Sequence, residues 1–523
     1  MRRKWYLGFG VFLLLILFRL TMWNDARWFP VILVPIILLG IYDVLQKKHS
    51  ILRNFPVLGH IRFVLEFLRP EIRQYFVAGD EDELPFNRET RSLIYQRAKN
   101  VRDTMPFGTE RNIFEVGYTW VLHSLAPKDL SLVEPRLMVG GPSCKKPYNA
   151  SRLNISAMSF GALSANAIMA LNKGAKLGGF AHNTGEGGLS PYHLQGGDLI
   201  FQLGTAYFGC RTEDGAFDDE LFKIEANRDE VKMIEIKLSQ GAKPSHGGIL
   251  PAAKVTPEIA RIRHIKMGED ALSPPAHSEF NSPKGLLEFV ERLRLLSGGK
   301  PIGFKLCIGK KDEFLGICKA MIETSILPDF ITVDGAEGGT GAAPVEFSNN
   351  MGEPLDSGLT FAHNALVGIN VRDKIRIICS AKITNGYEMI LRTAMGADMC
   401  NSARAMMMAV GCVQSKQCDA NTCPTGVATQ NLRLQRGLVV EEKKYRAANY
   451  HRNTMKSFLE MVGAMGLENP DDIKPHHVMR RISDNCVKSL AELYCYLKPG
   501  ELLGDDIPED FKIDWEKARA DAF

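Results

Sequence analysis

Short apolar runs alternate with helical patterns along most of the chain from residue 150 onward. The runs are rich in β-branched and aliphatic residues and end in small or polar ones, which is typical of strands buried on both faces. The expected strands are Leu153–Met158, Gly179–Asn183, Leu199–Leu203, Met233–Lys237, Pro301–Leu306, Phe330–Val333, Ile375–Cys379 and Ala397–Cys400. Helical patterns such as Ala165–Lys176, Pro283–Leu296 and Gly386–Met395 lie between them. Eight strand–helix repeats favour a (β/α)8 barrel over an open doubly wound sheet.

Glycine and polar residues gather directly after several of these strands. The stretches concerned are Ser159–Gly161, Thr184–Gly188, Gln240–Lys243 and Asp334–Gly341. In a barrel of parallel strands the carboxyl ends meet at one face, and that face carries the active site. We therefore expect the chemistry of this chain to lie in these loops.

Two dense apolar runs precede this pattern. They extend from Trp5 to Phe18 and from Trp28 to Tyr42, with basic residues outside both. A cleaved signal peptide and a buried core hairpin are alternatives, but no small-residue cleavage site is evident and a second run follows the first. We predict a two-helix membrane hairpin over residues 1–48. The positive-inside rule then places the catalytic part on the cytoplasmic face of the cell inner membrane.

The remaining segments have weaker patterns. Residues 49–149 predict an irregular, partly helical segment that packs on the barrel. The barrel is expected over residues 150–440, with a cysteine-containing loop at 412–423. From residue 441 the pattern becomes helical and charged, and it predicts a helical extension to residue 523.

Composition and charge exclude some classes of function. The chain's 523 residues include 64 basic and 60 acidic ones, for a net charge of +4, so no strong field favours nucleic acid. Its 11 cysteines are an odd number with one tight cluster, which indicates a reducing compartment and a metal site rather than disulfides. A GxGxxG fingerprint is missing from the sequence, so we do not expect NAD(P)H to bind this chain directly.

Two features of the predicted strands suit a phosphorylated flavin. The glycine-rich loop Asp334–Gly341 follows a strand, where its backbone N–H groups could approach a phosphate, although it could equally be a mobile turn. Lys305 lies within a buried strand, where a lysine is rare unless it is paired or faces a ligand. A cation at that place would stabilise an anionic reduced flavin.

Charged residues in two other loops suit a small dicarboxylate. Lys243 lies in the stretch Gly241–Gly248, and Arg263 follows it. A lysine and an arginine near one site can hold two carboxylates. Glu186, between glycines, would lie at the same face and could act as an acid or base or hold an ammonium group. Each residue alone could also be a solvated loop charge.

Three cysteines form the remaining motif, Cys412-x5-Cys418-x4-Cys423-Pro424. A cysteine followed by proline is typical of iron–sulfur motifs. Three thiolates suit a cluster with three protein ligands, or a zinc site with a fourth ligand elsewhere. The lack of a CxxC pair in the sequence argues against most zinc folds.

Five strings in order resemble the FMN-binding domain of the glutamate synthase large subunit. They are Ser156–Ser164, Thr184–Gly188, Gln240–Pro244, Lys254–Pro257 and Cys423–Gln430, and the resemblance extends from about residue 150 to 465. The apolar pair at the amino terminus and the stretch Arg53–Pro56 resemble a short membrane-anchored bacterial branch of that family.

The resemblance implies an FMN barrel with a 3Fe–4S cluster and assigns its residues. Lys243, Arg263 and Glu186 match the site of 2-oxoglutarate and its imine, with Glu186 and Lys243 as the catalytic pair. Cys412, Cys418 and Cys423 match the cluster ligands. The residues that match the FMN site are Ala157, Met158, Ser159, Lys305, Gly338, Gly339, Thr340, Ser402 and Arg404.

The chain departs from the family's pattern at several positions. Ile249 replaces the usual glutamine, His246 replaces an acidic residue, and Ser380–Lys382 replaces an Asp-Gly-Gly. Residue 2 is arginine rather than a nucleophilic cysteine, so we expect no glutaminase domain, and the C-terminal glycine-repeat β-helix of the large enzymes is not expected either. These departures affect the prediction of which 2-oxo acid and which amine are the substrates.

We therefore expect an FMN- and 3Fe–4S-dependent oxidoreductase acting on CH–NH2 donors. Electrons would come from a ferredoxin or a reductase subunit, and 2-oxoglutarate with free ammonia would give L-glutamate. One alternative is a flavin enzyme for another 2-oxo acid or amine, of the N-alkylglutamate synthase type, which Ile249 favours. Another is a membrane electron-transfer or redox-sensing subunit.

Overall fold

The computed structural model describes residues 29–523 except residue 102. The chain divides into two compact units, one ending at Glu89 and the other beginning at Thr90. Helix α5 (Arg88–Lys99) spans this boundary. The two units are described separately below.

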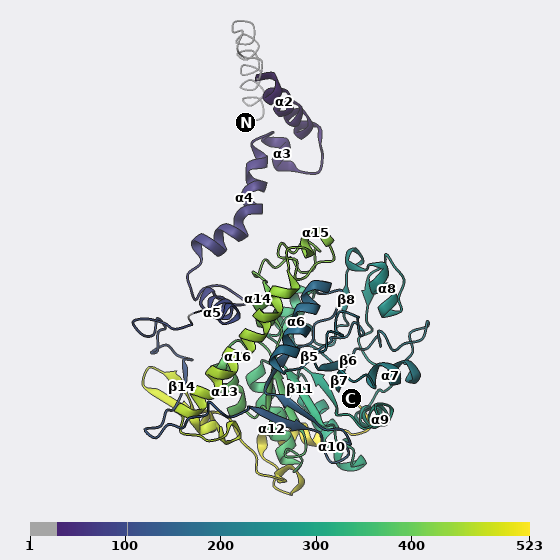
Figure 1. Cartoon of the computed structure of the whole chain (residues 1–523), viewed down its shortest axis with the longest axis vertical. Helices are drawn as coiled ribbons and strands as arrows, with labels where there is room; N and C mark the ends of the chain where they lie inside the picture. The colour runs from purple at the N-terminus through teal and green to yellow at the C-terminus, as the bar shows by residue number, and fades with distance from the viewer. Residues whose placement is uncertain (1–28, 102) are drawn as a thin grey trace. The chain divides into compact units, whose positions relative to one another are not determined.

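The second unit is built on a closed barrel of eight parallel strands (Figure 1). The strands, in barrel order, are β4 (Leu153–Ile155), β5 (His182–Asn183), β6 (Leu199–Leu203), β7 (Val231–Lys237), β10 (Ile302–Leu306), β11 (Phe330–Asp334), β12 (Arg376–Ser380) and β13 (Met399–Ser402). The last strand pairs with the first, Cys400 opposite Leu153, which closes the barrel. All eight strands expected from the apolar runs are present, so the prediction of a (β/α)8 barrel is confirmed.

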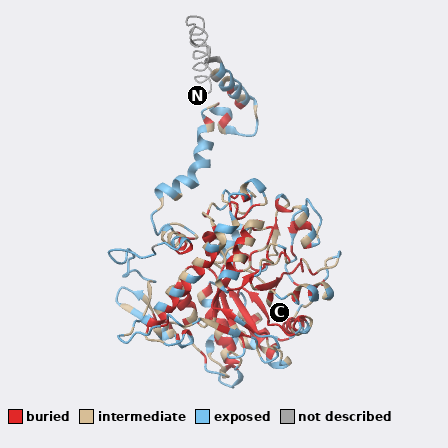
Figure 2. Ribbon diagram, in the orientation of Figure 1, coloured by how far each residue is buried: buried red, intermediate tan, exposed pale blue. Residues whose placement is uncertain are grey.

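Helices surround the barrel and shield the outer faces of its strands (Figures 1 and 2). They are α6 (Ala165–Gly178), α7 (Asp219–Ala226), α9 (Pro283–Leu296), α10 (Lys311–Thr324), α12 (Leu355–Gly368), α13 (Gly386–Ala394), α14 (Arg404–Val410) and α16 (Val440–Ala464). Helix α16 packs closely on α6. A Cβ added to Gly174 of α6 would lie only 2.6 Å from the Cβ of Ala447 on α16, so the close approach occurs at this glycine. Burial on both faces explains why the strands are continuous apolar runs.

A hairpin closes the amino-terminal end of the barrel. Strands β2 (Arg136–Val139) and β3 (Tyr148–Ser151) pair with each other. Their buried side chains, including Val139 and Ala150, join one core cluster with residues near the starts of the barrel strands, such as Ile200 and Met399. The opposite, carboxyl end therefore remains for the functional loops.

One carboxylate is buried inside the barrel. Glu235 on β7 accepts hydrogen bonds from Asn183 Nδ2 at 2.8 Å, Gln202 Nε2 at 2.6 Å and Thr332 Oγ1 at 2.6 Å. These donors come from β5, β6 and β11, so one side chain fixes four strands relative to one another. A buried charge is tolerated when its lone pairs are satisfied in this way.

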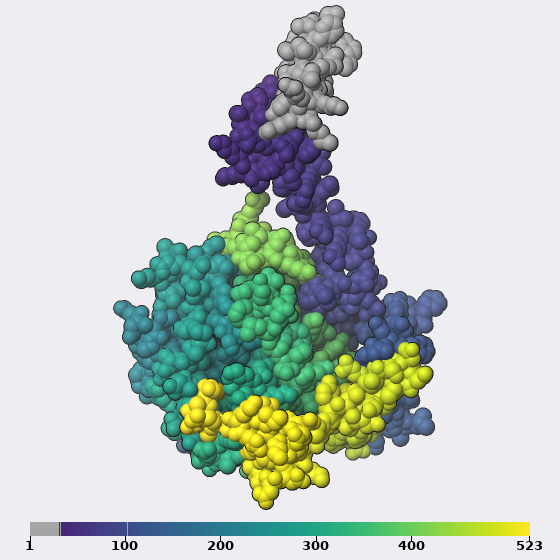
Figure 3. All heavy atoms as spheres, turned by 180° about the vertical axis from the view of Figure 1, so that it is seen from behind, coloured from purple at the N-terminus to yellow at the C-terminus, as the bar shows by residue number. Residues whose placement is uncertain are grey.

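The segment after α16 is not wholly helical, which corrects the prediction of a helical extension. Strands β14 (Val478–Ser483) and β15 (Cys486–Ser489) pair with β1 (Thr119–Val121) in an antiparallel sheet. Short helices α17 (Leu490–Leu493) and α18 (Glu509–Lys517) follow. This segment, yellow in Figure 3, lies on the surface of the unit. The smaller elements are β8 (Ile249–Leu250), β9 (Ala271–Leu272), α8 (Pro257–Arg263), α11 (Val345–Asn350), α15 (Leu432–Gln435) and the 3-10 turns Ala252–Lys254, Pro470–Asp472, Pro475–His477 and Glu501–Leu503.

The described residues of the first unit, from residue 29 onward, form several helices. They are α2 (Phe29–Leu45), α3 (Ser50–Asn54), α4 (Gly59–Ile72) and the π-helix η1 (Arg73–Val77). Asp43 on α2 is buried and accepts hydrogen bonds from Val57 N at 2.8 Å and His60 Nε2 at 2.9 Å. This contact fixes α2 to the start of α4.

The prediction of an inner-membrane location is wrong, and the described residues support neither the membrane hairpin nor the membrane-anchored branch. Across residues 29–523, residue 102 apart, none of the helices has the length and apolar character needed to cross a bilayer. Helix α2, of which 17 residues are described, covers most of the second apolar run. The first run, Trp5–Phe18, lies outside the described residues.

Candidate active site at the carboxyl end of the barrel

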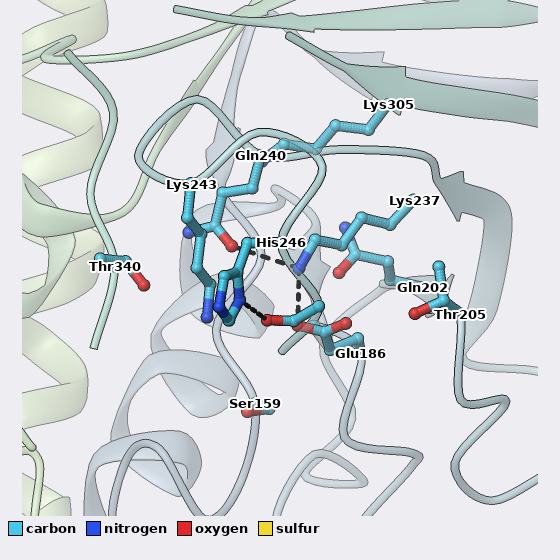
Figure 4. A network of polar contacts seen from close by, with 12 residues as sticks. Ser159, Glu186, Gln202, Thr205, Lys237, Gln240, Lys243, His246, Lys305 and Thr340 are labelled. Atoms are coloured by element: carbon cyan, nitrogen blue, oxygen red, sulfur yellow. Dashed lines mark hydrogen bonds and ion pairs between the residues drawn. The ribbon is translucent and has the colours of Figure 1, made fainter. Parts of the chain in front are cut away.

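Strands β7 and β10 and the loops that follow β5 and β7 bring charged side chains together at the carboxyl end of the barrel (Figure 4). Lys237, the last residue of β7, points toward Glu186, and Nζ lies 2.6 Å from Oε1. Lys237 Nζ also donates to Gln240 Oε1 at 3.2 Å. Lys237 and Glu186 are both mostly shielded from solvent, so their interaction is only weakly screened.

Glycines position Glu186 against its neighbours. Gly185 has φ +66°, and a Cβ there would lie 2.6 Å from Ser159 N, so its backbone packs directly on the loop after β4. A Cβ on Gly248 would lie 2.6 Å from Glu186 Oε1 and 3.0 Å from Ser273 Oγ. Glycine is needed at both places because a side chain would displace the carboxylate or the backbone.

Three cations act on the Glu186 carboxylate. Burial opposes its ionisation, but Lys237, Lys243 and Arg263 outweigh burial and hold the pKa of Glu186 below its usual value. Burial, together with the nearby Lys237, lowers the pKa of Lys243 to about 8, although Glu186 acts in the opposite direction. Burial likewise lowers the pKa of Arg263 to about 10. Glu186, Lys243 and Arg263, expected together from the sequence, therefore lie close enough to interact.

Arg263 ends helix α8, which begins after Thr256, a residue whose hydroxyl accepts from Ile259 N. Its Nη2 donates to Phe160 O at 3.1 Å and to Ser159 Oγ at 3.3 Å. Among the described residues, the buried atoms Arg263 Nε and Ser273 Oγ have no hydrogen-bond partner. Buried polar atoms without partners are costly unless a ligand or water satisfies them.

A second group of residues suits a flavin phosphate and its ring. Lys305 on β10 is buried, and its Nζ lies 3.4 Å from Asp334 Oδ2. Arg404 Nη2 donates to Glu337 O at 2.7 Å, and a Cβ on Gly339 would meet the Arg404 side chain at 2.8 Å. Ser402 Oγ donates to Ile383 O at 2.7 Å. Because the Arg404 side chain packs directly on the glycine loop, its positive charge and the backbone N–H groups of the loop are both available to an anion.

The other residues expected at the site have local partners. Lys243 Nζ donates to Ala342 O at 3.0 Å, and Gln240 Nε2 donates to Gly339 O at 2.6 Å, so the loops after β7 and β11 are joined.

His246 Nδ1 lies 3.0 Å from Gly247 O. Ile249 begins β8 opposite Leu272. Thr340 is exposed, and its hydroxyl donates to Ala342 O, whereas Met158 is buried and Ala157 half-buried.

Burial raises the pKa of Cys412 and of Cys418 most, and neighbouring thiols add to it: Cys418 and Cys423 act on Cys412, and Cys423 acts on Cys418. Burial also opposes ionisation of Cys423, but hydrogen bonds from Ala428 N–H and from the Thr425 side chain and backbone leave its pKa below its usual value. Within residues 29–523, residue 102 excepted, no three His, Cys, Asp or Glu side chains are grouped tightly enough for one metal ion. Three neighbouring sulfurs with backbone donors fit a multinuclear cluster better than a single zinc ion.

Sequence reasoning missed Lys237, which makes the shortest ion pair of the site with Glu186. The signal was present, since a lysine at the end of a buried strand is as unusual as Lys305. Ser273 was also missed, and no sequence signal marks it, because its position beside Glu186 depends on β8 and β9 pairing.

Comparisons with known proteins show which family and relatives the chain is similar to. Residues 127–468 match the family model described as the conserved region in glutamate synthase. The glutamate synthase large subunit-like protein YerD of Bacillus subtilis is 36% identical over 508 residues, covering 88% of this chain and 96% of that protein. The archaeal-type glutamate synthase [NADPH] of Thermotoga neapolitana is 33% identical over 315 residues, 60% of this chain and 59% of that protein. A solved mutant of flavocytochrome b2 with benzoylformate has a TM-score of 0.44 at 12% identity, covering 89% of this chain and 98% of that one.

Proposed function

The chain belongs to the glutamate synthase family, and from this premise we propose that it reduces the imine of 2-oxoglutarate and ammonia to L-glutamate. It is an oxidoreductase of the glutamate synthase type. The observation that carries the proposal is the meeting of one carboxylate, Glu186, with Lys237, Lys243 and Arg263 at the carboxyl end of the barrel.

FMN is the proposed cofactor. The Gly338–Gly339 backbone, Thr340, Ser402 and Arg404 would hold its phosphate end, and Ala157, Met158 and Ser159 would line the ring. The buried ammonium of Lys305 would face the pyrimidine end and favour negative charge there. When bound, FMN supplies hydride transfer to the imine carbon.

Lys243 and Arg263 would hold the two carboxylates of 2-oxoglutarate. Arg263 is already fixed by Ser159 and Phe160, and its Nε, which pairs with none of the residues that the structure describes, leaves a donor for the substrate. A fixed guanidinium loses little entropy on binding, which supports its use as an anchor. Ser273 Oγ supplies a second unpaired polar atom near Glu186.

Glu186 would hold the ammonium group and then the iminium formed from it. Because Lys237 and its neighbours keep the carboxylate ionised, it attracts a cation at neutral pH and would stabilise the charge of ammonium or of the iminium. Lys243, with its pKa near 8, can give up or take back a proton at the same site. These two residues are the proposed catalytic pair, Glu186 holding the cation and Lys243 transferring the proton.

Cys412, Cys418 and Cys423 would bind an iron–sulfur cluster, which we propose to be of the 3Fe–4S type and to relay single electrons. Its electrons would come from a ferredoxin or a reductase subunit. The archaeal-type relative is named for NADPH, and a reductase partner would connect such a donor to this chain.

The test is reoxidation of the pre-reduced protein by a panel of 2-oxo acids and amines, with each product identified by mass. We expect release of FMN, not FAD, on denaturation, and L-glutamate from 2-oxoglutarate plus ammonium. Ile249, in place of the family's glutamine, favours a second candidate, reduction of an imine from another 2-oxo acid or an alkylamine. If only another 2-oxo acid or an alkylamine reoxidises the flavin, the second candidate is supported. If no 2-oxo acid and amine reoxidise it, the protein is a redox subunit without imine-reducing activity.

A further inference from the structure

The loop that follows β4 is held by three side chains from two other segments. The carbonyls of residues 160–163 accept hydrogen bonds in succession from Arg263 Nη2 at 3.1 Å, Gln430 Nε2 at 3.0 Å, Lys254 Nζ at 2.8 Å and again Gln430 Nε2 at 2.9 Å. This loop, called here the flavin-side loop (residues 159–163), also carries Ser159. Its shape therefore depends on those three side chains.

Lys254 makes a second contact from the same nitrogen. Its side chain is almost fully buried, and Nζ donates to Cys418 O at 2.9 Å as well as to Ala162 O. One ammonium group thus joins the flavin-side loop to the thiol loop (residues 412–423). A buried ammonium needs such acceptors, so neither carbonyl can move away without cost.

The neighbours of Lys254 reinforce this bridge. Asn421 Nδ2 donates to Ala253 O at 3.0 Å, and Asn421 Oδ1 accepts from Gln430 N at 2.6 Å. The thiol loop is therefore fixed to the 3-10 turn Ala252–Lys254, from which helix α8 leads to Arg263. The same short segment contacts the thiol loop at one end and supplies the substrate-binding arginine at the other.

We propose that Lys254 is a positioning residue that couples the thiol loop to the substrate site. This inference rests on the proposed function, in which the three cysteines hold a cluster and Arg263 binds the 2-oxo acid. Loading of the thiols holds Cys418 O in place, Lys254 transmits that position to Ala162, and the ordered flavin-side loop holds Arg263. Since coupling between two binding events is reciprocal, the 2-oxo acid should also slow loss of the cluster.

A double-mutant cycle tests the coupling in the full-length protein. The four forms are wild type, Lys254→Met, Cys418→Ser and the double variant. The Kd of 2-oxoglutarate is measured without turnover, from the absorbance change of the oxidised bound flavin, beside iron per FMN. We expect each single variant to weaken binding about tenfold, and the double variant to be no weaker than either, because both changes break one connection.

Lys300→Met is the matched control. Lys300 is also buried and donates to two carbonyls, Ala226 O at 2.7 Å and Arg228 O at 2.8 Å, but these precede β7 at the other end of the barrel. It should change neither the Kd nor the iron content. Lys254→Arg, which keeps the charge and the donors, should recover part of the affinity, a rescue not expected if only packing mattered.

The reciprocal measurement is release of iron to a chelator. Saturating 2-oxoglutarate should slow release from wild type and not from Lys254→Met. If Lys254→Met does not fold, Lys254→Gln and Gln430→Leu take its place in the cycle. Two outcomes overturn the coupling alone, provided that the wild type contains iron. One is that the losses of 2-oxoglutarate affinity in the two single variants add up in the double variant. The other is that Cys418→Ser loses its iron but keeps the wild-type affinity for 2-oxoglutarate. Wild type prepared without oxygen and still free of iron refutes the cluster, and the coupling with it.

Discussion

Lys237 Nζ lies 2.6 Å from Glu186 Oε1, which makes the last residue of β7 the partner of the carboxylate after β5. The two strands are not adjacent in the barrel, since β6 lies between them. The pair joins two loops across one strand, and it keeps Glu186 ionised despite burial.

The first prediction concerns pH. Lys237→Met removes the nearest cation, so the pKa of Glu186 should rise from its lowered value. Glu186 then becomes protonated at a higher pH, and the acidic limb of kcat/KM for imine reduction should shift upward in pH. Lys237→Arg retains the charge and should shift the limb less. An acidic limb at the same pH in both variants and wild type would show that Glu186 is not the titrating group.

Arg263 supplies the second prediction. Arg263→Met should weaken 2-oxoglutarate binding by roughly one to two powers of ten, because a charge-assisted contact contributes about 1.5–3 kcal/mol. FMN content should stay unchanged. Arg261→Met, on the same helix but exposed, is the matched control and should bind like wild type. Loss of FMN together with substrate affinity would instead assign Arg263 to the shape of the flavin-side loop.

The third prediction tests the thiol loop. Cys418→Ser should remove iron and sulfide while most FMN remains bound, because a hydroxyl replaces a thiolate ligand poorly. Iron and acid-labile sulfide are measured beside the flavin absorbance. Cys495→Ser changes an exposed cysteine outside the loop and should keep its iron. Equal iron in both variants would contradict ligation by Cys418.

Stability of the barrel should depend on Glu235. Glu235→Ala leaves the donors of Asn183, Gln202 and Thr332 unpaired, and each costs about 1–3 kcal/mol. The free energy of unfolding should therefore fall by at least about 3 kcal/mol, as measured by denaturant titration. Glu213→Ala, at an exposed loop position, should change it by less than about 0.5 kcal/mol. A small effect at Glu235 would mean that water replaces the lost carboxylate.

The sequence by itself determined the barrel and much of its chemistry. Strands buried on both faces must be continuous apolar runs, so all eight could be predicted. The loops after them contain Glu186 and Lys243, and Lys305 lies on β10 itself. The spacing of Cys412, Cys418 and Cys423 was also visible, because a thiol loop is local in sequence. An apolar run alone, however, could not distinguish a membrane span from a helix that packs on its neighbours, as α2 does where Asp43 accepts a hydrogen bond from His60.

The tertiary structure decided which side chains meet. The pairing of Lys237 with Glu186 spans 51 residues, and the contacts of Lys254 span 92 and 164 residues. The periodicity of apolar residues predicts which face of one element is buried. It does not predict which residues on other elements that face contacts. Closure of the barrel brings the strand ends into one ring, and that long-range geometry makes Glu186, Lys237, Lys254 and Arg263 parts of one site.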